Sequence, residues 1–284
     1  MRSVTASIVV YNNSLAEIER SLATLETSQC VALWVVVDNS ASEEIKNFTA
    51  STGGIYIRTG RNVGFGAGHN IALKALGQTD AEFHLILNPD IDFDGRILPE
   101  LMEVMGDAPD VGLIMPKISY ADGRIQHLCK LLPAPIDLVL RRFLPGPLSR
   151  FAEKRISSYE LRGLNYNAPA YVPTLSGCFM FLRRSVLDAV GGFDERFFLY
   201  MEDVDLCRRM SRISKLLYWP EVSAVHGYQM GSYRNLRLLH LHVRSAFSYF
   251  NKWGWIWDKD RRDVNKAMLN TIRKSRHAAK GELS

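Results

Sequence analysis

The sequence has few cysteines, and their spacing gives them no collective function. The 284 residues include 4 cysteines and no CxxC pair, so neither a zinc knuckle nor a disulfide framework is indicated. A reducing, cytoplasmic setting fits this usage. No run reaches the roughly 18 apolar residues that a membrane-spanning helix needs, and the apolar segment near the N-terminus is too short for a signal peptide. We therefore expect a soluble or peripheral protein.

The composition also lacks the biases of disordered, collagen-like and disulfide-scaffold proteins, with 47% hydrophobic and 23% charged residues. The length allows one large α/β domain or one domain with a substantial appendage. Positive charge is concentrated at one end: residues 234–284 hold 12 Lys or Arg against 4 Asp or Glu, whereas the whole chain has a net charge of +5. This basic, aromatic tail could meet nucleic acid, anionic lipid or only solvent.

Strands alternate with helices in the first half of the chain. Apolar, β-branched runs predict strands at residues 5–12, 32–40, 55–60 and 83–90, and helical spacing follows the first three of them, from Leu15, near Glu43 and after a glycine-rich turn. This alternation indicates βαβ units and a mostly parallel central sheet flanked by helices. In such sheets, ligands bind at the carboxyl ends of the strands.

The second half is less regular. We expect a helix at residues 98–106, then a strand, a turn and a strand within 111–125, and a partly helical excursion at 128–170. A strand, a helix closed by two glycines, a helix from about Asp203 and a strand before His226 should follow, and then a helical C-terminal segment. That segment places Leu236, Leu239 and Val243 on one stripe and should lose regular structure after about Arg273.

Three acids follow a buried strand directly. In FHLILNPDIDFD, the apolar run is succeeded by Asp90, Asp92 and Asp94. Carboxylates in a loop just past a strand suit a hard cation such as Mg²⁺ or Mn²⁺ that bridges to phosphate. Turn chemistry, or acids placed at the start of a helix, would explain the same residues and stays open.

A second acidic cluster, YMEDVDLCRR, opens a helix. Glu202, Asp203 and Asp205 could simply be capping residues. The aromatic residues before them favour another reading, because apolar surroundings raise the pKa of a carboxylate and make it a usable general base.

Two further features could take part in a site. The glycine-rich turn GRNVGFGAGHN, which is neither a P-loop nor a clean GxGxxG, would let backbone N–H groups approach a phosphate. His226 is either structural or a metal ligand. The other histidines, including His69, His84, His127 and His242, have weaker claims.

Taken in order, SIVVYNN, VVVDNS, RNVGFGAGHN, LILNPDI, SGCFMFLRRSVLDAVGGFDERFFLYMEDVDLCRR and the later His226 resemble the inverting family 2 glycosyltransferases of the GT-A fold. The likeness is to the rhamnosyltransferase branch that builds bacterial surface polysaccharides such as O-antigen, and it covers roughly residues 4–230. It implies a Rossmann-like glycosyltransferase domain at 1–233, with a nucleotide-sugar-binding half (1–115) and an acceptor and catalytic half (116–233). A basic helical extension (234–284) would follow.

The resemblance also implies roles for individual residues. Asn88-Pro89-Asp90 falls on the DxD position with Asn in the first place, which should weaken binding of Mn²⁺ or Mg²⁺. The metal would be held by Asp90, with Asp92 as a weaker second ligand and His226 completing the site. Asp203, preceded by Glu202, would be the general base. Asp38 would contact the nucleotide base, Gly177 and Cys178 would lie on the acceptor side, and the donor pocket would be lined by Asn62, Gly64, Gly68, Asn70 and Asn88.

These roles describe transfer of a sugar, L-rhamnose from dTDP-L-rhamnose in the first instance, to a hydroxyl of a glycan or lipid-linked acceptor. A UDP-hexose donor is the alternative within the enzyme class. A nucleic-acid-binding protein using the basic tail would leave both acidic clusters unexplained, and a carbohydrate-binding protein without activity is a further alternative. Residues 137–151 and the basic C-terminus could dock on the inner membrane leaflet or be merely solvated. A homo-oligomer stays open.

Overall fold

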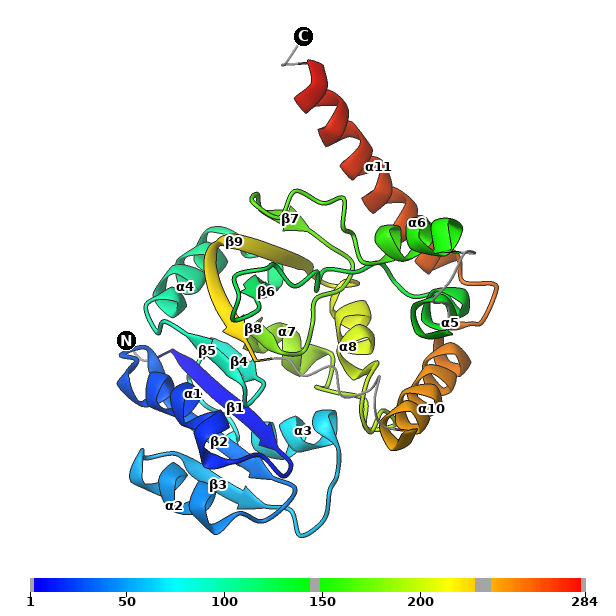
Figure 1. Cartoon of the computed structure of the whole chain (residues 1–284). Helices are drawn as coiled ribbons and strands as arrows, with labels where there is room; N and C mark the ends of the chain where they lie inside the picture. Colours follow the sequence, from blue (N-terminus) through cyan, green and yellow to red (C-terminus); the bar gives the residue numbers. More distant parts are fainter. Residues whose placement is uncertain (1–2, 144–148, 228–235, 282–284) are drawn as a thin grey trace.

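The computed structural model describes residues 3–143, 149–227 and 236–281, and shows a mixed α/β fold with one central sheet between helices (Figure 1). The side chains of residues 141–151 lie outside the described part, and so does most of the segment 137–151 that was predicted to contact the membrane. The strands are β1 Val4–Val10, β2 Val31–Asp38, β3 Ile55–Arg58, β4 Phe83–Leu87, β5 Ile91–Phe93, β6 Val111–Ser119, β7 Ala170–Tyr171, β8 Phe179–Arg183 and β9 Lys215–His226. The helices are α1 Leu15–Thr27, α2 Glu43–Ser51, α3 Phe65–Leu76, α4 Ile97–Asp107, α5 Pro135–Phe143, α6 Ser149–Tyr159, α7 Arg184–Ala189, α8 Glu202–Met210, α10 Leu236–Trp253 and α11 Lys259–Gly281.

The sheet has the order β3-β2-β1-β4-β8-β6-β9-β5, with β7 paired to β9. Strands β3, β2, β1 and β4 are parallel, as the sequence predicts. The prediction of a mostly parallel sheet is confirmed, because β6 and β9 pair in parallel and run in the same direction as these four strands. Among the described strands, β8, β5 and β7 run the other way. The chain reaches β8 through the long excursion after β6 rather than through a helical crossover, so nothing constrains it to run parallel.

Helices cover both faces of the sheet, and the side chains of β2 point alternately to one face and the other. Val36 belongs to the core shared with α1 and α2, whereas Val35 and Val37 pack with Ala72 and Leu76 of α3. Successive side chains of a strand point to opposite faces. The β-branched run is therefore buried on both faces of the sheet, which explains why apolar and polar residues do not alternate along it.

Three local predictions need correction. The strand predicted at 83–90 ends at Leu87, and after the turn at Asn88-Pro89-Asp90 the chain forms the short β5, which pairs with β9. The second strand predicted within 111–125 is a single bridge between Ser119 and Ile125. Helix α11 continues to Gly281, beyond the end predicted near Arg273.

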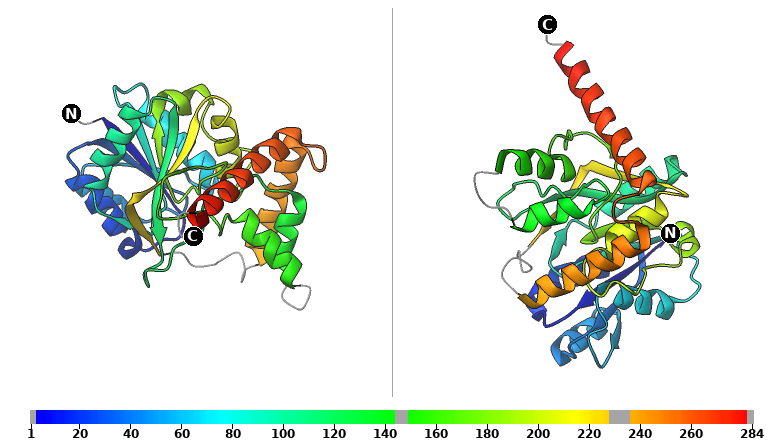
Figure 2. Two further views of the ribbon diagram at one scale, coloured as in Figure 1. Left: turned by 90° about the horizontal axis from the view of Figure 1, so that it is seen from above. Right: turned by 90° about the vertical axis from the view of Figure 1, so that its right-hand side faces the viewer.

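The predicted C-terminal extension is joined closely to the domain before it. Tyr249 and Phe250 of α10 are buried in a cluster with Phe197, Met201 and Val204 around the start of α8. Helix α11 projects beyond the body of the molecule (Figure 2). In the described part of the chain, no helix is both long and apolar enough to cross a bilayer.

Candidate active site

A cavity of about 910 Å³ lies where the carboxyl end of β4 meets the start of α8. Its wall includes Asn88, Gly177, Cys178, Asp203 and His226. These residues come from four parts of the chain, and a backbone hydrogen bond of 2.8 Å from Asn88 to the carbonyl of Cys178 joins two of them. The fold therefore brings the segments of both predicted acidic clusters to one cavity.

Asp90 and His226 are in contact at one side of this cavity. Nε2 of His226 lies 3.2 Å from a carboxylate oxygen of Asp90 and 3.3 Å from the amide nitrogen of Asn88, and Nδ1 lies 3.1 Å from Oε1 of Gln126. Burial alone would lower the pKa of His226, but its contacts with Asp90 and the Cys178 thiol outweigh burial and raise the pKa to about 10. The imidazolium therefore offsets the charge of Asp90.

Asp92 does not join this pair, so the predicted three-residue metal site is wrong in that member. Its carboxylate forms an ion pair of 2.9 Å with Arg20 of α1. The buried neighbours Ile91 and Phe93 show why, because alternation along β5 turns the side chain between them to the other face. Among the described residues, no three His, Cys, Asp or Glu side chains gather as metal ligands.

The remaining donors still fit a divalent cation. Asp90 and the amide oxygen of Asn88 offer oxygen ligands beside the cavity, and His226 would offer Nε2 as a nitrogen ligand once a bound cation displaces its proton. Mg²⁺ and Mn²⁺ are commonly held by one or two protein groups together with substrate phosphate oxygens. A site with a single carboxylate accords with the Asn at the first DxD position.

Asp203 is held at the cavity by the start of α8. Its carboxylate accepts hydrogen bonds from the backbone N–H groups of Gly177, at 3.1 Å, and Val204, at 2.8 Å. A Cβ on Gly177 would lie 3.3 Å from Cβ of Asp203, so glycine permits this close approach. The two residues before the helix, Tyr200 and Met201, both have φ of 69°, a left-handed conformation that is unfavourable for large side chains.

The carboxylate with the raised pKa is that of Glu202. Its side chain is buried, and Oε2 has no hydrogen-bond partner. Burial, and then the negative charge of Asp203, raise the pKa of Glu202 to about 8. Glu202 therefore holds a proton near neutral pH beside Asp203.

Both carboxylate oxygens of Asp38 are hydrogen-bonded to other groups of the protein. Asp38 is buried, and its two oxygens accept hydrogen bonds from the backbone of Ser40, Ala41 and Ser42 and from the hydroxyls of Ser40 and Tyr56. Burial would raise the pKa of Asp38, but these hydrogen bonds outweigh it and hold the pKa below its usual value. In the structure Asp38 fixes the loop after β2, and its contact with a base stays a prediction.

The glycine-rich turn supports the loop that leads to α8. Gly64 has φ of 92°, and a Cβ there would lie 2.1 Å from the carbonyl oxygen of Phe198. Asn62 accepts a hydrogen bond from the Gly64 N–H, and Gly68 lies close against Val9.

Asn70 holds the same loop from the other end of the turn. Its amide exchanges hydrogen bonds of 2.9 Å with the backbone of Phe193 and also donates to Glu195. From the turn, only Phe65 is among the residues that line the cavity. The roles predicted for Asn62, Gly64, Gly68 and Asn70 in donor binding stay predictions, and the contacts seen are structural ones.

Several cavity residues have only a weak signal in the sequence, or none. His127, Lys130 and Arg162 come from the excursion after β6, and His242 comes from α10, where its ring lies 4.8 Å from that of Tyr200. Only the tertiary fold unites these positions. His69 and His84 do not line the cavity: both are buried and share the hydroxyl of Ser7 as a hydrogen-bond partner.

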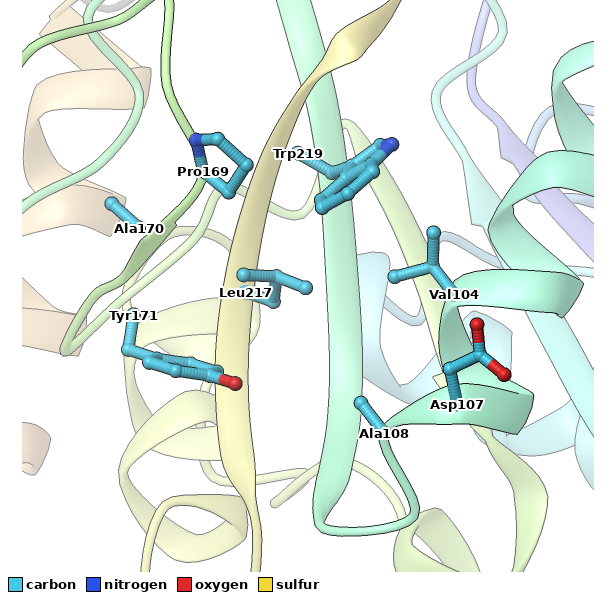
Figure 3. A pocket seen from close by; sticks show the side chains of 8 residues that line it. All are labelled: Val104, Asp107, Ala108, Pro169, Ala170, Tyr171, Leu217 and Trp219. Atoms are coloured by element: carbon cyan, nitrogen blue, oxygen red, sulfur yellow. The ribbon is translucent and has the colours of Figure 1, made fainter.

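A second, smaller cavity of about 320 Å³ lies between α4 and β9 (Figure 3). Its wall is mostly apolar and includes Trp219, Leu217 and Tyr171, with Asp107 as its one carboxylate. It shares no lining residue with the larger cavity. The larger cavity is lined by Asp203 and His226, from both groups of predicted site residues, so we assign the candidate active site to it.

Comparison with solved structures identifies the fold as GT-A, that of glycosyltransferases. The mannosyltransferase PcManGT from Pyrobaculum calidifontis, solved in complex with GDP-Man and Mn²⁺, superimposes with a TM-score of 0.55 at 16% identity, covering 99% of this chain and 79% of the other. No protein-family model matches the chain.

Among glycosyltransferases, the proteins similar in sequence to this chain include rhamnosyltransferases. The N-acetylglucosaminyl-diphospho-decaprenol L-rhamnosyltransferase of Mycobacterium tuberculosis is 31% identical over 183 residues, which are 59% of this chain and 57% of that protein. The rhamnosyltransferase WbbL of Escherichia coli is 26% identical over 223 residues, or 76% and 80% of the two chains. The resemblance to rhamnosyltransferase-like glycosyltransferases is confirmed, although the chain spans little more than half of the mycobacterial relative.

Proposed function

We propose that the protein is an inverting glycosyltransferase that moves L-rhamnose from dTDP-L-rhamnose to a hydroxyl of a glycan or lipid-linked acceptor in surface-polysaccharide synthesis. One observation carries this proposal: Asp203 and His226, the partner of Asp90, line the same cavity. A group able to accept a proton and a group able to hold a diphosphate thus lie around one space, as an in-line displacement requires.

In this proposal each residue has a distinct task. Asp203, oriented by the N–H groups of Gly177 and Val204, takes the proton from the attacking hydroxyl. Glu202, which is protonated near neutral pH, adds no second negative charge beside it. Asp90 and His226 hold the diphosphate end of the donor, and a Mn²⁺ or Mg²⁺ ion bound there would offset the negative charge of the departing diphosphate.

The choice of rhamnose follows from the names of the two relatives, both rhamnosyltransferases. A UDP-hexose is the second candidate, because the described contacts of Asp38 and of the glycine-rich turn involve the protein alone and do not distinguish one nucleotide from another. A lipid-linked acceptor is supported by the mycobacterial relative, whose name specifies a diphospho-decaprenol. Such an acceptor implies that the protein works at the cytoplasmic face of the inner membrane, with its basic C-terminal region against the leaflet.

A donor screen tests the proposal. The melting temperature would be measured with dTDP-L-rhamnose, UDP-glucose, UDP-galactose and GDP-mannose, each with and without Mn²⁺. A ligand at about 100 times its Kd stabilises a protein by about 2.7 kcal/mol, which a thermal shift detects. The largest shift should come from dTDP-L-rhamnose; a larger shift from a UDP-hexose would favour the second candidate, and no shift from any nucleotide sugar would contradict the proposal.

A further inference from the structure

Helix α10 and the residues after it expose large apolar side chains on one surface. We call Val243, Phe247, Trp255, Ile256 and Trp257 the α10 face; they are between 37% and 84% exposed. The rings of Phe247 and Trp255 lie 4.9 Å apart, so the helix meets the segment after it through exposed aromatic side chains, and Ile256 and Trp257 follow directly in the chain. Leu236, which begins α10 and lies on the same stripe as Val243, is also exposed. Large contiguous apolar surfaces on soluble proteins usually mark an interaction site.

The charge around this face is positive. Helix α10 contains no Asp or Glu. The guanidinium-bearing Arg244 precedes Phe247 by three positions, which places the two on neighbouring parts of the helix surface, and Lys259 follows shortly after Trp257. Of the two acids nearest in sequence, Asp258 is buried against Arg208, and the more exposed Asp260 is paired with Arg208 and Arg212. An apolar surface flanked by basic residues suits an anionic, partly apolar partner.

The other side of α10 touches the candidate active site. Ser245 donates a hydrogen bond of 2.9 Å to the carbonyl of Leu199, and His242 lines the cavity beside Tyr200. Val243, of the α10 face, is the residue after His242. Whatever binds the α10 face is therefore held next to the cavity that contains Asp203.

We propose that the α10 face docks on an anionic lipid bilayer, with Ile256 and Trp257 at the boundary between headgroups and acyl chains and Arg244 at the lipid phosphates. This inference rests on the proposed function only in that a lipid-linked acceptor would need the cavity at the membrane surface. Tryptophan favours that boundary because its ring is apolar and its N–H is polar. Two copies meeting through this face would bring like-charged arginines together, which opposes self-association. Figure 1 shows α10 at the periphery of the molecule, away from the strands β1–β3.

Co-sedimentation of the full chain with vesicles tests the docking. Wild-type protein should bind vesicles of phosphatidylcholine and phosphatidylglycerol, and bind pure phosphatidylcholine less. The double substitution Ile256→Ser with Trp257→Ser should weaken binding by about tenfold or more, since apolar burial drives such docking. Arg244→Gln should weaken it about fivefold, the factor that matches about 1 kcal/mol for one basic residue at an anionic surface. Ile213→Ser, which removes an exposed apolar side chain from the turn after α8, is the matched control and should change nothing.

Two other measurements make the outcome decisive. Equal vesicle binding by the wild type and the double variant would overturn the inference, as would a wild-type dimer in analytical ultracentrifugation that the double variant lacks. The thermal shift with dTDP-L-rhamnose should be the same in both proteins, which also shows that the variant is folded. If the double variant loses vesicle binding but neither protein responds to any nucleotide sugar, the docking surface stands and the proposed function fails.

Discussion

The guanidinium group of Arg208 and the carboxylate of Asp258 share two hydrogen bonds, of 2.6 and 2.7 Å, although both side chains are only 2% exposed. The same guanidinium also donates to Asp260 and lies 4.3 Å from the ring of Trp253. Arg208 belongs to α8, the helix that begins with Glu202 and Asp203. The pair therefore fixes the helix of the candidate base to the segment between α10 and α11.

Removing one partner of this pair should destabilise the fold strongly. Arg208→Leu would remove both charge-assisted hydrogen bonds from the buried Asp258 and leave Arg261, 3.8 Å away, as its nearest cation, at a cost of about 3–5 kcal/mol. Urea unfolding would measure the loss. Arg20→Gln is the control, because Arg20 and Asp92 form an exposed pair that should contribute about 0–1 kcal/mol. Equal losses in the two variants would show that burial does not set the strength of the Arg208 contact.

Asp203→Asn should abolish transfer without abolishing donor binding. The amide keeps the shape of the side chain but cannot take a proton, so the transfer rate should fall by about 10²- to 10⁴-fold. Rates would be measured with dTDP-L-rhamnose, and donor binding by thermal shift. Asp188→Asn, at an exposed carboxylate paired with Arg184, is the matched control and should keep full activity. Retained activity in Asp203→Asn would mean that another group is the base.

Asp90 and Asp92 should respond differently to substitution. Asp90→Asn should lose the extra donor stabilisation that Mn²⁺ provides, because Asp90 is the carboxylate beside His226. Asp92→Asn should keep it, because Asp92 is paired with Arg20 away from that contact. Thermal shifts with donor, with and without Mn²⁺, compare the two. The same response from both variants would contradict the assignment.

Glu202 should make the stability of the protein depend on pH. Burial and Asp203 raise its pKa from 4.5 to about 8 in the folded state. Between these values the folded state keeps a proton that the unfolded state releases, so this stabilising effect is complete below pH about 4.5 and is lost as the pH rises towards 8. The slope contributed is at most about 1.4 kcal/mol per pH unit.

Glu202→Gln tests this effect, because glutamine has the same shape and does not titrate. Urea unfolding at several values between pH 5 and 8 would compare it with the wild type. The wild type should lose stability relative to the variant as the pH rises. Parallel curves would show that Glu202 is ionised in the folded protein throughout this range.

The parts of the fold that depend on local pattern were predictable, and the parts that depend on distant pairing were not. The β-branched run of β2 and the helical spacing of α1 each specify an element within a dozen residues. The antiparallel insertion of β8 between β4 and β6 follows from no such pattern.

The same distinction applies to the candidate site. Asp203 and Asp90 stand in recognisable motifs, and the cavity unites Asp203 with the partner of Asp90. The side chain of Asp92 had the same motif in its favour, but its direction is set by the register of β5 with β9, which the sequence does not reveal. His242 had no motif, since it reaches the cavity only because α10 folds back onto the loop before α8.

The left-handed conformations of Tyr200 and Met201 have a consequence for any shortened form of the protein. Each costs about 1–3 kcal/mol and persists only where neighbouring contacts impose it. Besides the glycine-rich turn, helix α10 supplies such contacts, through the hydrogen bond from Ser245 and the packing of Tyr249 and Phe250. We therefore expect a chain cut before residue 236 to relax this bend and to shift Asp203, so that the proposed transfer would slow even where no membrane is present.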